Sequence, residues 1–385
     1  MGTTRERTSE SVRSYVFDHR DSFLETCRDL VEIETPSDEP ETIDPAFDYL
    51  EEQFKKIGFQ THRIPGRETA GCLYAAPSRN ERTPEHQLLL GHVDTVWSTG
   101  TLEERPFRVE GDRARGPGLF DMKAGLAQIF LALECLREND LSPSKTPLIL
   151  VNSDEEIGSP ESTRTINRLA SCVDRALVFE PAITPDGAIK TARKGLGHFT
   201  VTIQGKASHA GLSPEEGQSA IVELSHIIQA LNNLNDPDNG ITVNVGVIEG
   251  GSRSNVVAAQ GSAEVDVRVL SQDQADELEA SIRNLTPENE NVELSIEGGF
   301  RRPPMERTPG NRELWRTIQA AGQKLGLELE EGRSGGGSDG NLTSQHTPTV
   351  DGLGAVGGGA HEEHEYIEVP RTLERAALLS LLLLE

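Results

Sequence analysis

The feature that most constrains the fold is a set of short apolar runs, each followed closely by histidine or acidic residues. The runs Leu88–Leu90, Leu148–Val151 and Ala176–Phe179 carry no charge, as expected of strands that are buried on both faces. Helical patterns separate these runs, and such alternation favours a mostly parallel sheet flanked by helices. The sequence therefore predicts an α/β domain.

The alternation changes between residues 194 and 302, where the expected elements follow the order βαββαβ. This order is the split-βαβ or ferredoxin-like plan, and the α/β pattern resumes after it. We therefore predict a discontinuous domain of residues 1–193 and 303–385, with a second domain inserted at 194–302.

The charge of the chain excludes some classes of partner. It has 63 acidic and 37 basic residues and a net charge of −26, with the acids spread along its length. Such a surface repels nucleic acid and anionic membranes, and no apolar run approaches the ~20 residues of a membrane helix. A polar N-terminus without a signal-peptide pattern predicts a cytoplasmic protein. Dispersed acid, scarce lysine and only 4% aromatic residues predict a high-salt cytoplasm.

His92 and Asp94 follow the first apolar run, and the carboxyl ends of such strands are where active residues gather in α/β domains. Their i, i+2 spacing puts both side chains on one face of an extended segment. A metal-ligating histidine needs its second ring nitrogen held, often by a carboxylate, and Asp94 could do this. A lone pair of this kind is nevertheless more often structural.

Three further segments offer carboxylates. Asp121 follows a glycine-rich loop at a predicted helix N-cap, where aspartate is favoured for capping alone. Asp154–Glu156 follow the second run, and three adjacent acids need compensating positive charge such as a metal ion. A solvated acidic loop is the alternative there. Glu180 ends the third run, where it could also be an ordinary strand terminus.

The last cluster is Gly357–Tyr366, in which glycines allow close approach to a ligand and His361 competes with His364 for one metal role. Each of these signals is weak alone. Together they fit a site in which one carboxylate bridges two metal ions and a histidine and a carboxylate complete each ion. A remaining glutamate could then act as general base.

The motifs occur in the order GHVDTV, GPGLFDMKAG, SDEEIGS, FEP, GKASHAG, SNVV, DVR, GGGSDGN and GGGAHEEHEY. With them the chain resembles, over nearly its whole length, the superfamily of zinc exopeptidases that includes aminoacylases, acetylornithine deacetylases, succinyl-diaminopimelate desuccinylases and glutamate carboxypeptidases. It is most similar to the glutamate carboxypeptidase (carboxypeptidase G) branch.

The resemblance implies the ligands of two Zn2+ ions, for which Co2+ or Mn2+ could substitute. One ion would be held by His92, Asp121 and Glu180, and the other by Asp121, Glu156 and His361. His361 is preferred over His364 because the family's ligand precedes a Glu-Tyr pair by four residues.

The resemblance also implies roles for residues around the ions. Glu155 would be the general base, and Asp94 would orient a ligand from behind. The family carries a cis peptide after its bridging aspartate, which would here be Asp121–Met122.

The inserted segment matches the family's lid and dimerisation domain, so the resemblance implies a homodimer formed through residues 194–302. His209 would reach the active site of the other subunit and stabilise the oxyanion. Asn255 and Arg268 would bind the free carboxylate of the substrate, a task suited to a planar guanidinium. Arg302 could read a substrate side chain or be a charged linker residue.

Together these features predict hydrolysis of an amide bond beside a free carboxylate in a small peptide or N-acyl amino acid. The site suits a carboxypeptidase or dipeptidase as well as an N-acyl amino acid deacylase. A metal-stabilised binding protein without turnover is a third interpretation, and the presence of Glu155 beside Glu156 argues against it.

Overall fold

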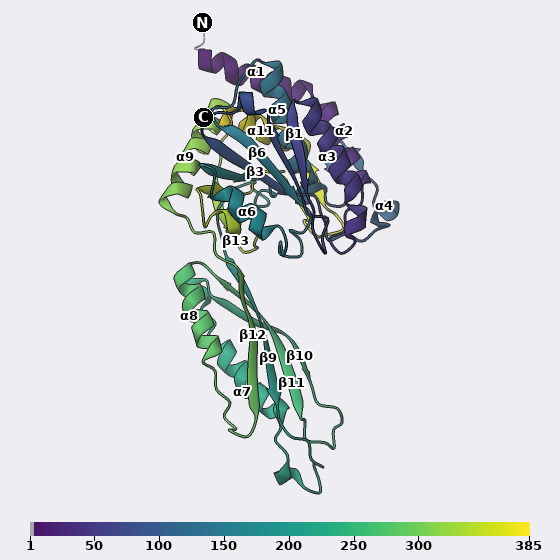
Figure 1. Ribbon diagram of the computed structural model, residues 1–385, viewed down its shortest axis with the longest axis vertical. Coiled ribbons are helices and arrows are strands. Elements are labelled where there is room, and N and C mark those ends of the chain that lie inside the picture. Colours follow the sequence, from purple (N-terminus) through teal and green to yellow (C-terminus); the bar gives the residue numbers. More distant parts are fainter. Residues whose placement is uncertain (1–3) are drawn as a thin grey trace. The chain divides into compact units, whose positions relative to one another are not determined.

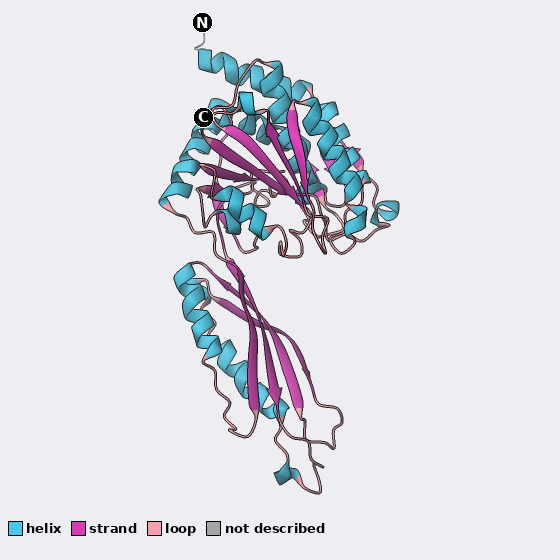
Figure 2. Cartoon of the chain, in the orientation of Figure 1, coloured by secondary structure: helices cyan, strands magenta, loops and turns pink. Residues whose placement is uncertain are grey.

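The computed structural model describes residues 4–385, with side chains from Arg7 onward, and the chain divides into two compact units (Figures 1 and 2). Unit 1 contains the chain up to Ala192 together with Arg307–Ser334 and Ser338–Glu385. Unit 2 contains Arg193–Glu306 and the three glycines Gly335–Gly337. The catalytic and lid roles expected for the two parts stay predictions.

Unit 1 is built on a six-stranded sheet that lies among helices (Figure 2). In the order in which they lie side by side, its strands are β1 (Phe59–Ile64), β2 (Cys72–Pro77), β6 (Thr146–Asn152), β3 (His86–His92), β7 (Arg175–Val178) and β14 (Thr349–Val350). The pairs from β6 to β14 are parallel, and β2 is antiparallel to both of its neighbours. The predicted α/β fold with a mostly parallel sheet is confirmed.

Burial of this sheet on both faces explains the apolar runs. Leu89 of β3 packs into the largest core cluster, whereas Leu88 and Leu90 pack into a separate cluster with Ile166 of α6 (Thr163–Ala170). Successive side chains of a strand point to opposite faces. A strand covered on both faces is therefore apolar at consecutive positions.

Helices also contribute to both of these clusters. The cluster of Leu88 also contains Leu342 of α10 (Gly340–Thr343). The cluster of Leu89 contains residues from α1 (Thr4–Asp18), α2 (Arg20–Glu32), α3 (Asp44–Lys56), α5 (Ala124–Glu138), α9 (Pro309–Lys324) and α11 (Val369–Leu382).

Small elements complete unit 1. Helix α4 spans Thr101–Glu104, and β8 (Ile189–Arg193) pairs with β13 (Glu331–Ser334). A four-stranded sheet has the order β15 (Gly357–Gly358), β16 (Tyr366–Glu368), β5 (Arg113–Arg115) and β4 (Arg108–Glu110). Its pairing of Tyr366 with Arg115 joins the C-terminal glycine-rich loop to the segment that precedes Asp121.

Unit 2 has the predicted βαββαβ order. Its elements are β9 (Gly195–Gln204), α7 (Ala220–Asn232), β10 (Thr242–Gly250), β11 (Gln260–Val269), α8 (Gln272–Arg283) and β12 (Glu293–Arg302). The sheet order β10-β11-β9-β12, with every pair antiparallel, is ferredoxin-like. Alternate residues of β9, namely Phe199, Val201 and Ile203, are buried in one core with residues of both helices.

None of the described helices is both long and apolar enough to cross a membrane.

Candidate metal centre

The carboxyl ends of three adjacent parallel strands bring sequence-distant residues together. His92 is the last residue of β3, while Glu156 and Glu180 lie shortly beyond the ends of β6 and β7. Because β6, β3 and β7 are neighbours that run parallel, these ends lie at one edge of the sheet.

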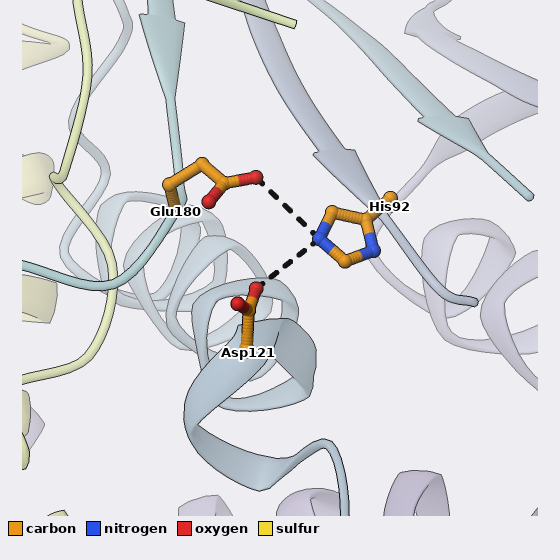
Figure 3. A group of neighbouring side chains, drawn as sticks. All are labelled: His92, Asp121 and Glu180. Atoms are coloured by element: carbon orange, nitrogen blue, oxygen red, sulfur yellow. Dashed lines mark ion pairs between the residues drawn. The ribbon is translucent and has the colours of Figure 1, made fainter. Parts of the chain in front are cut away.

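The first group of side chains is His92, Asp121 and Glu180 (Figure 3). Nε2 of His92 lies 3.3 Å from Oδ1 of Asp121 and 3.4 Å from Oε1 of Glu180. His92 and Glu180 are 1% and 7% exposed. This group is therefore well shielded from solvent.

The second group is Asp121, Glu156 and His361. Nε2 of His361 lies 3.4 Å from Oδ2 of Asp121 and 3.1 Å from Oε2 of Glu156. Asp121 thus turns one oxygen to each group, as a bridging carboxylate does. The side chain of His361 is 50% exposed, so the second group is closer to solvent than the first. His364 belongs to neither group among the described residues and lies 2.9 Å from Glu362.

Three polar atoms of these groups are buried without a hydrogen-bond partner in the described part of the chain. They are Nε2 of His92, Oδ1 of Asp121 and Oε1 of Glu156. Each such atom costs about 1–3 kcal/mol when it stays unpaired, and a metal ion would accept its lone pair. A set of imidazole and carboxylate ligands fits Zn2+, and also Co2+ or Mn2+.

The same carboxylates hold protons on both histidines. Burial disfavours the charged form of His92, but the neighbouring carboxylates of Asp121, Asp94 and Glu180 outweigh it and raise the pKa of His92 well above its usual value. Hydrogen bonds with Asp121 and Glu156 raise the pKa of His361 to about 11. The cluster therefore attracts positive charge strongly, as a metal site must.

Asp94 is fully buried behind His92 and holds two parts of the site. The Nδ1 atom of His92 lies 3.0 Å from the backbone carbonyl of Asp94 and 3.4 Å from its carboxylate. The carboxylate accepts hydrogen bonds from the N–H groups of Glu155 and Glu156 and from the hydroxyl of Ser37. Asp94 therefore fixes the backbone of the acidic turn as well as the ring of His92.

Glu155 and Glu156 have different surroundings although they are adjacent. Glu156 contributes to the second group, while Glu155 is absent from both groups. Glu155 is half-buried, and its N–H is held by Asp94 at 3.3 Å. Its backbone is therefore held next to that of Glu156, and its carboxylate is not one of the grouped ligand atoms.

The prediction that Asp121 caps a helix is wrong. Helix α5 begins at Ala124 with Lys123 at its N-cap, and Asp121 lies within a π-turn in a non-helical conformation (φ −116°, ψ 95°). Its carboxylate faces the two histidines instead of the helix N–H groups. The implied cis peptide Asp121–Met122 is present.

The glycines before His361 have separate structural reasons. A Cβ atom at Gly357 would lie 2.0 Å from the carbonyl oxygen of Tyr366, so the β15–β16 pair requires glycine there. Gly359 has a φ of +80°, and His361 itself has a φ of +61°, which is uncommon for a residue with a side chain. These backbone conformations of Gly359 and His361 form the turn that places the imidazole of His361 in the second group.

Glu365 is the site-supporting residue that the sequence analysis missed. It is 3% exposed, and its carboxylate accepts hydrogen bonds from Gly118, Phe120 and Asp121 of the opposite loop. Burial raises its pKa to about 7. In the sequence, Glu365 belongs to the Glu-Tyr pair that was used only to choose His361 over His364. The presence of this pair next to a predicted ligand could also have indicated that Glu365 itself supports the site.

The pattern of peptidase family M20/M25/M40 matches residues 88–385. The chain belongs to this family. It is therefore a metal-dependent hydrolase of the M20 metallopeptidase and amidohydrolase type.

Two curated relatives and one solved M20 structure are similar to the chain over most of its length. Carboxypeptidase G2 of Pseudomonas sp. (strain RS-16) is 32% identical over 381 residues, which cover 94% of this chain and 89% of that one. Succinyl-diaminopimelate desuccinylase of Bradyrhizobium sp. (strain ORS 278) is 27% identical, over 84% of this chain and 89% of that one. The Bacillus subtilis YXEP protein, described as a dinuclear metal binding peptidase from the M20 family, shares the fold with a TM-score of 0.68 at 15% identity, over 95% and 98% of the two chains.

His209 and Asn255 lie close together in unit 2 of this M20 protein. The N–H of Ala210 donates to the backbone carbonyl of Asn255 at 3.0 Å. Nδ1 of the exposed His209 accepts from the N–H groups of Gly211 and Leu212 at 3.1 and 3.2 Å. Because Nδ1 is an acceptor, the neutral imidazole carries its proton on Nε2 and can donate there.

Arg268 and Arg302 lie in the four-stranded sheet of unit 2, at the end that contains the first residues of β9. Both pair with Leu196 at the start of β9, from the two neighbouring strands. Arg268 bonds to Asp266 and to the carbonyl of Gly335, and Arg302 is 7% exposed. The ten residues of β9 span about 30 Å, and His209 lies beyond its far end. One unit 2 therefore does not bring Arg268 near His209 or Asn255.

Proposed function

We propose that the protein is a di-zinc exopeptidase that cleaves the amide bond before a C-terminal amino acid with a free carboxylate, such as glutamate. The observation that carries this proposal is the pair of ligand groups that share Asp121. The 32% identity with carboxypeptidase G2 over 94% of the chain supports the carboxypeptidase assignment.

In the proposed site, His92, Asp121 and Glu180 would hold one Zn2+, and Asp121, Glu156 and His361 would hold the other. Co2+ or Mn2+ would suit the same ligands. When bound, the two ions would polarise the scissile carbonyl and lower the pKa of the attacking water.

The residues of the chain would then move and hold the protons. Glu155 takes the proton of the attacking water and passes it to the leaving amine. Asp94 holds the N–H groups of Glu155 and Glu156, so the base and the ligand keep their relative positions. Nε2–H of His209 donates to the carbonyl oxygen as its negative charge develops.

Substrate binding is assigned to unit 2. Asn255 and Arg268 would bind the free carboxylate of the substrate, and Arg302 would read its side chain. Since one copy of unit 2 holds Arg268 and His209 at opposite ends of its sheet, we propose that His209 and Asn255 act on the partner's site in a homodimer.

An exposed apolar patch on unit 2 supports this homodimer through residues 194–302. β10 is an edge strand, and its residues Val247 and Ile248 are 51% and 59% exposed. On α7, Ile221 and Val222 are 47% and 57% exposed. An unpaired strand edge with apolar neighbours favours strand addition between two copies of this chain.

Hydrolysis of N-acyl amino acids is the second candidate function, because a relative at 27% identity is named succinyl-diaminopimelate desuccinylase. The same ligands and the same base would serve it. A non-catalytic, metal-stabilised protein is the remaining alternative.

A substrate panel on the Zn2+-loaded protein tests these assignments. The panel contains N-acyl glutamates, dipeptides with varied C-terminal residues, and acetylornithine, with Glu155→Gln as the control. Fastest release of a C-terminal glutamate supports the carboxypeptidase. Preference for acetylornithine would favour the deacylase. Absence of hydrolysis of every compound in the panel would refute both enzymes, and full activity of Glu155→Gln would refute the assigned base.

A further inference from the structure

Glu365 is a buried carboxylate whose two oxygens are fully used by hydrogen-bond donors. Oε1 accepts from the N–H groups of Phe120 and Asp121 at 2.7 and 3.0 Å. Oε2 accepts from the N–H of Gly118 at 2.9 Å and from the indole N–H of Trp97 at 3.1 Å. These four donors stabilise the charged form of a side chain that is only 3% exposed.

Among the described residues Glu365 makes no ion pair within 4 Å, although the buried Lys123 interacts with its charge at longer range. Glu365 also lies close to the acidic ligand groups, which makes its negative charge more costly. The reason for a buried carboxylate at this position is therefore the set of N–H donors that it holds in place. An apolar residue would be less costly if the position served packing alone.

Glu365 connects two of the three segments that carry ligands of the second group, namely those of Asp121 and His361. Three of its donors belong to Gly118–Asp121, and the last of these donors is the N–H of Asp121 itself. On its own loop, Glu365 follows His361 by four residues, and its N–H donates to Glu362 at 3.1 Å. One side chain thus links the backbone of Asp121 to the turn that presents His361.

The first group depends less on this link. His92 and Glu180 follow strands of the central sheet, so their positions are set by the core. His361 instead lies on a loop, is half exposed and has a φ of +61°. Such a conformation persists only where neighbouring contacts hold it, and Glu365 anchors that loop.

We infer that Glu365 is a positioning residue that joins Asp121 to the His361 loop and thereby controls the affinity of the second metal ion more than that of the first. The inference rests on the proposed two-metal site. It adds a residue that would be no ligand and would touch no substrate, yet would decide whether both ions bind.

Glu365→Gln tests this role with almost no change in size. The carboxamide replaces one acceptor oxygen with an NH2 donor, which must face two of the four donors whichever way it is turned. Loss of a residue that orients ligands typically weakens metal binding by about 10- to 100-fold. We expect this loss for the second Zn2+ and a change of less than about threefold for the first.

The measurement is Zn2+ titration by calorimetry, with metal content after dialysis and the Co2+ absorption spectrum as independent readouts. Glu363→Gln is the matched control, because Glu363 is an exposed residue of the same loop. Trp97→Phe removes a single donor and keeps the ring, so a smaller weakening of the second ion is expected. This variant also tests the inference if Glu365→Gln fails to fold.

Retention of one ion at nearly wild-type affinity with loss of the second would support the inference. Unchanged binding of both ions in Glu365→Gln and in Trp97→Phe would overturn it, as would equal weakening of both ions together with a lower Tm. A wild-type chain that binds only one ion would instead refute the proposed two-metal function, and the inference with it.

Discussion

Zn2+ binding to the metal-free protein at pH 7 is expected to release about two protons per chain. Hydrogen bonds with Asp121 and Glu156 raise the pKa of His361 to about 11. Against the opposing effect of burial, the negative charge of neighbouring carboxylates raises the pKa of His92 well above its usual value. Both imidazoles therefore carry a proton at neutral pH, and each must lose it before its nitrogen can bind a metal ion.

The sign of the pH dependence follows from these raised pKa values. Two displaced protons make the combined affinity for two ions rise about 100-fold per pH unit around neutrality. For the metal-free fold the effect is opposite. The stability that His361 gains from its proton is fully present below the unfolded pKa of about 6.5 and is lost as pH rises towards about 11.

Calorimetric titration with Zn2+ in several buffers of different ionisation enthalpy measures the released protons directly. His361→Ala should bind one ion and release about one proton, whereas the loop control His364→Ala should behave as wild type. Zero proton release in the wild-type protein, or an unchanged value in His361→Ala, would refute the assigned protonation and ligands.

Four further outcomes are expected. Glu155→Gln should lower kcat by about 100- to 10,000-fold at unchanged Zn2+ content, whereas Glu156→Gln should lose Zn2+; full activity of the first variant would exclude it as the base. Asp94→Asn should lower the free energy of unfolding by about 2–3 kcal/mol in urea denaturation, since the amide faces donors that the carboxylate accepts. If His209 serves the partner's site, mixing and refolding inactive His209→Ala with inactive Glu155→Gln should restore about a quarter of the activity, and no recovery in a proven heterodimer would contradict action across the dimer. Tm should rise between dilute buffer and molar KCl because salt screens the net charge of −26; equal Tm values would contradict the predicted high-salt cytoplasm.

The layers of the fold were predictable because burial leaves a direct mark on the sequence. β3 and β6 are covered on both faces, so their apolar residues run consecutively, while β9 is covered on one face and alternates. The two-residue strand β15 left no such mark, since a period cannot be read from so few positions.

The helix-cap prediction for Asp121 failed for a different reason. Aspartate after a glycine-rich loop is locally a good cap, but tertiary contacts decided its conformation. The N–H of Asp121 donates a hydrogen bond to Glu365, which lies 244 positions away in the chain. The carboxylate of Asp121 is thereby left to face the two histidines.

By itself, the sequence determined which chemical groups are present and which strand ends would carry them, because side-chain chemistry and hydrophobic period are local properties. Only the tertiary structure decided that Asp121 turns one oxygen to each ligand group and that His361, rather than His364, lies within reach of it. These are distances between segments that meet through sheet order and packing, and no local pattern encodes them. The role of Glu365 also depends on the tertiary structure, because its four hydrogen-bond donors come from segments far away in the sequence.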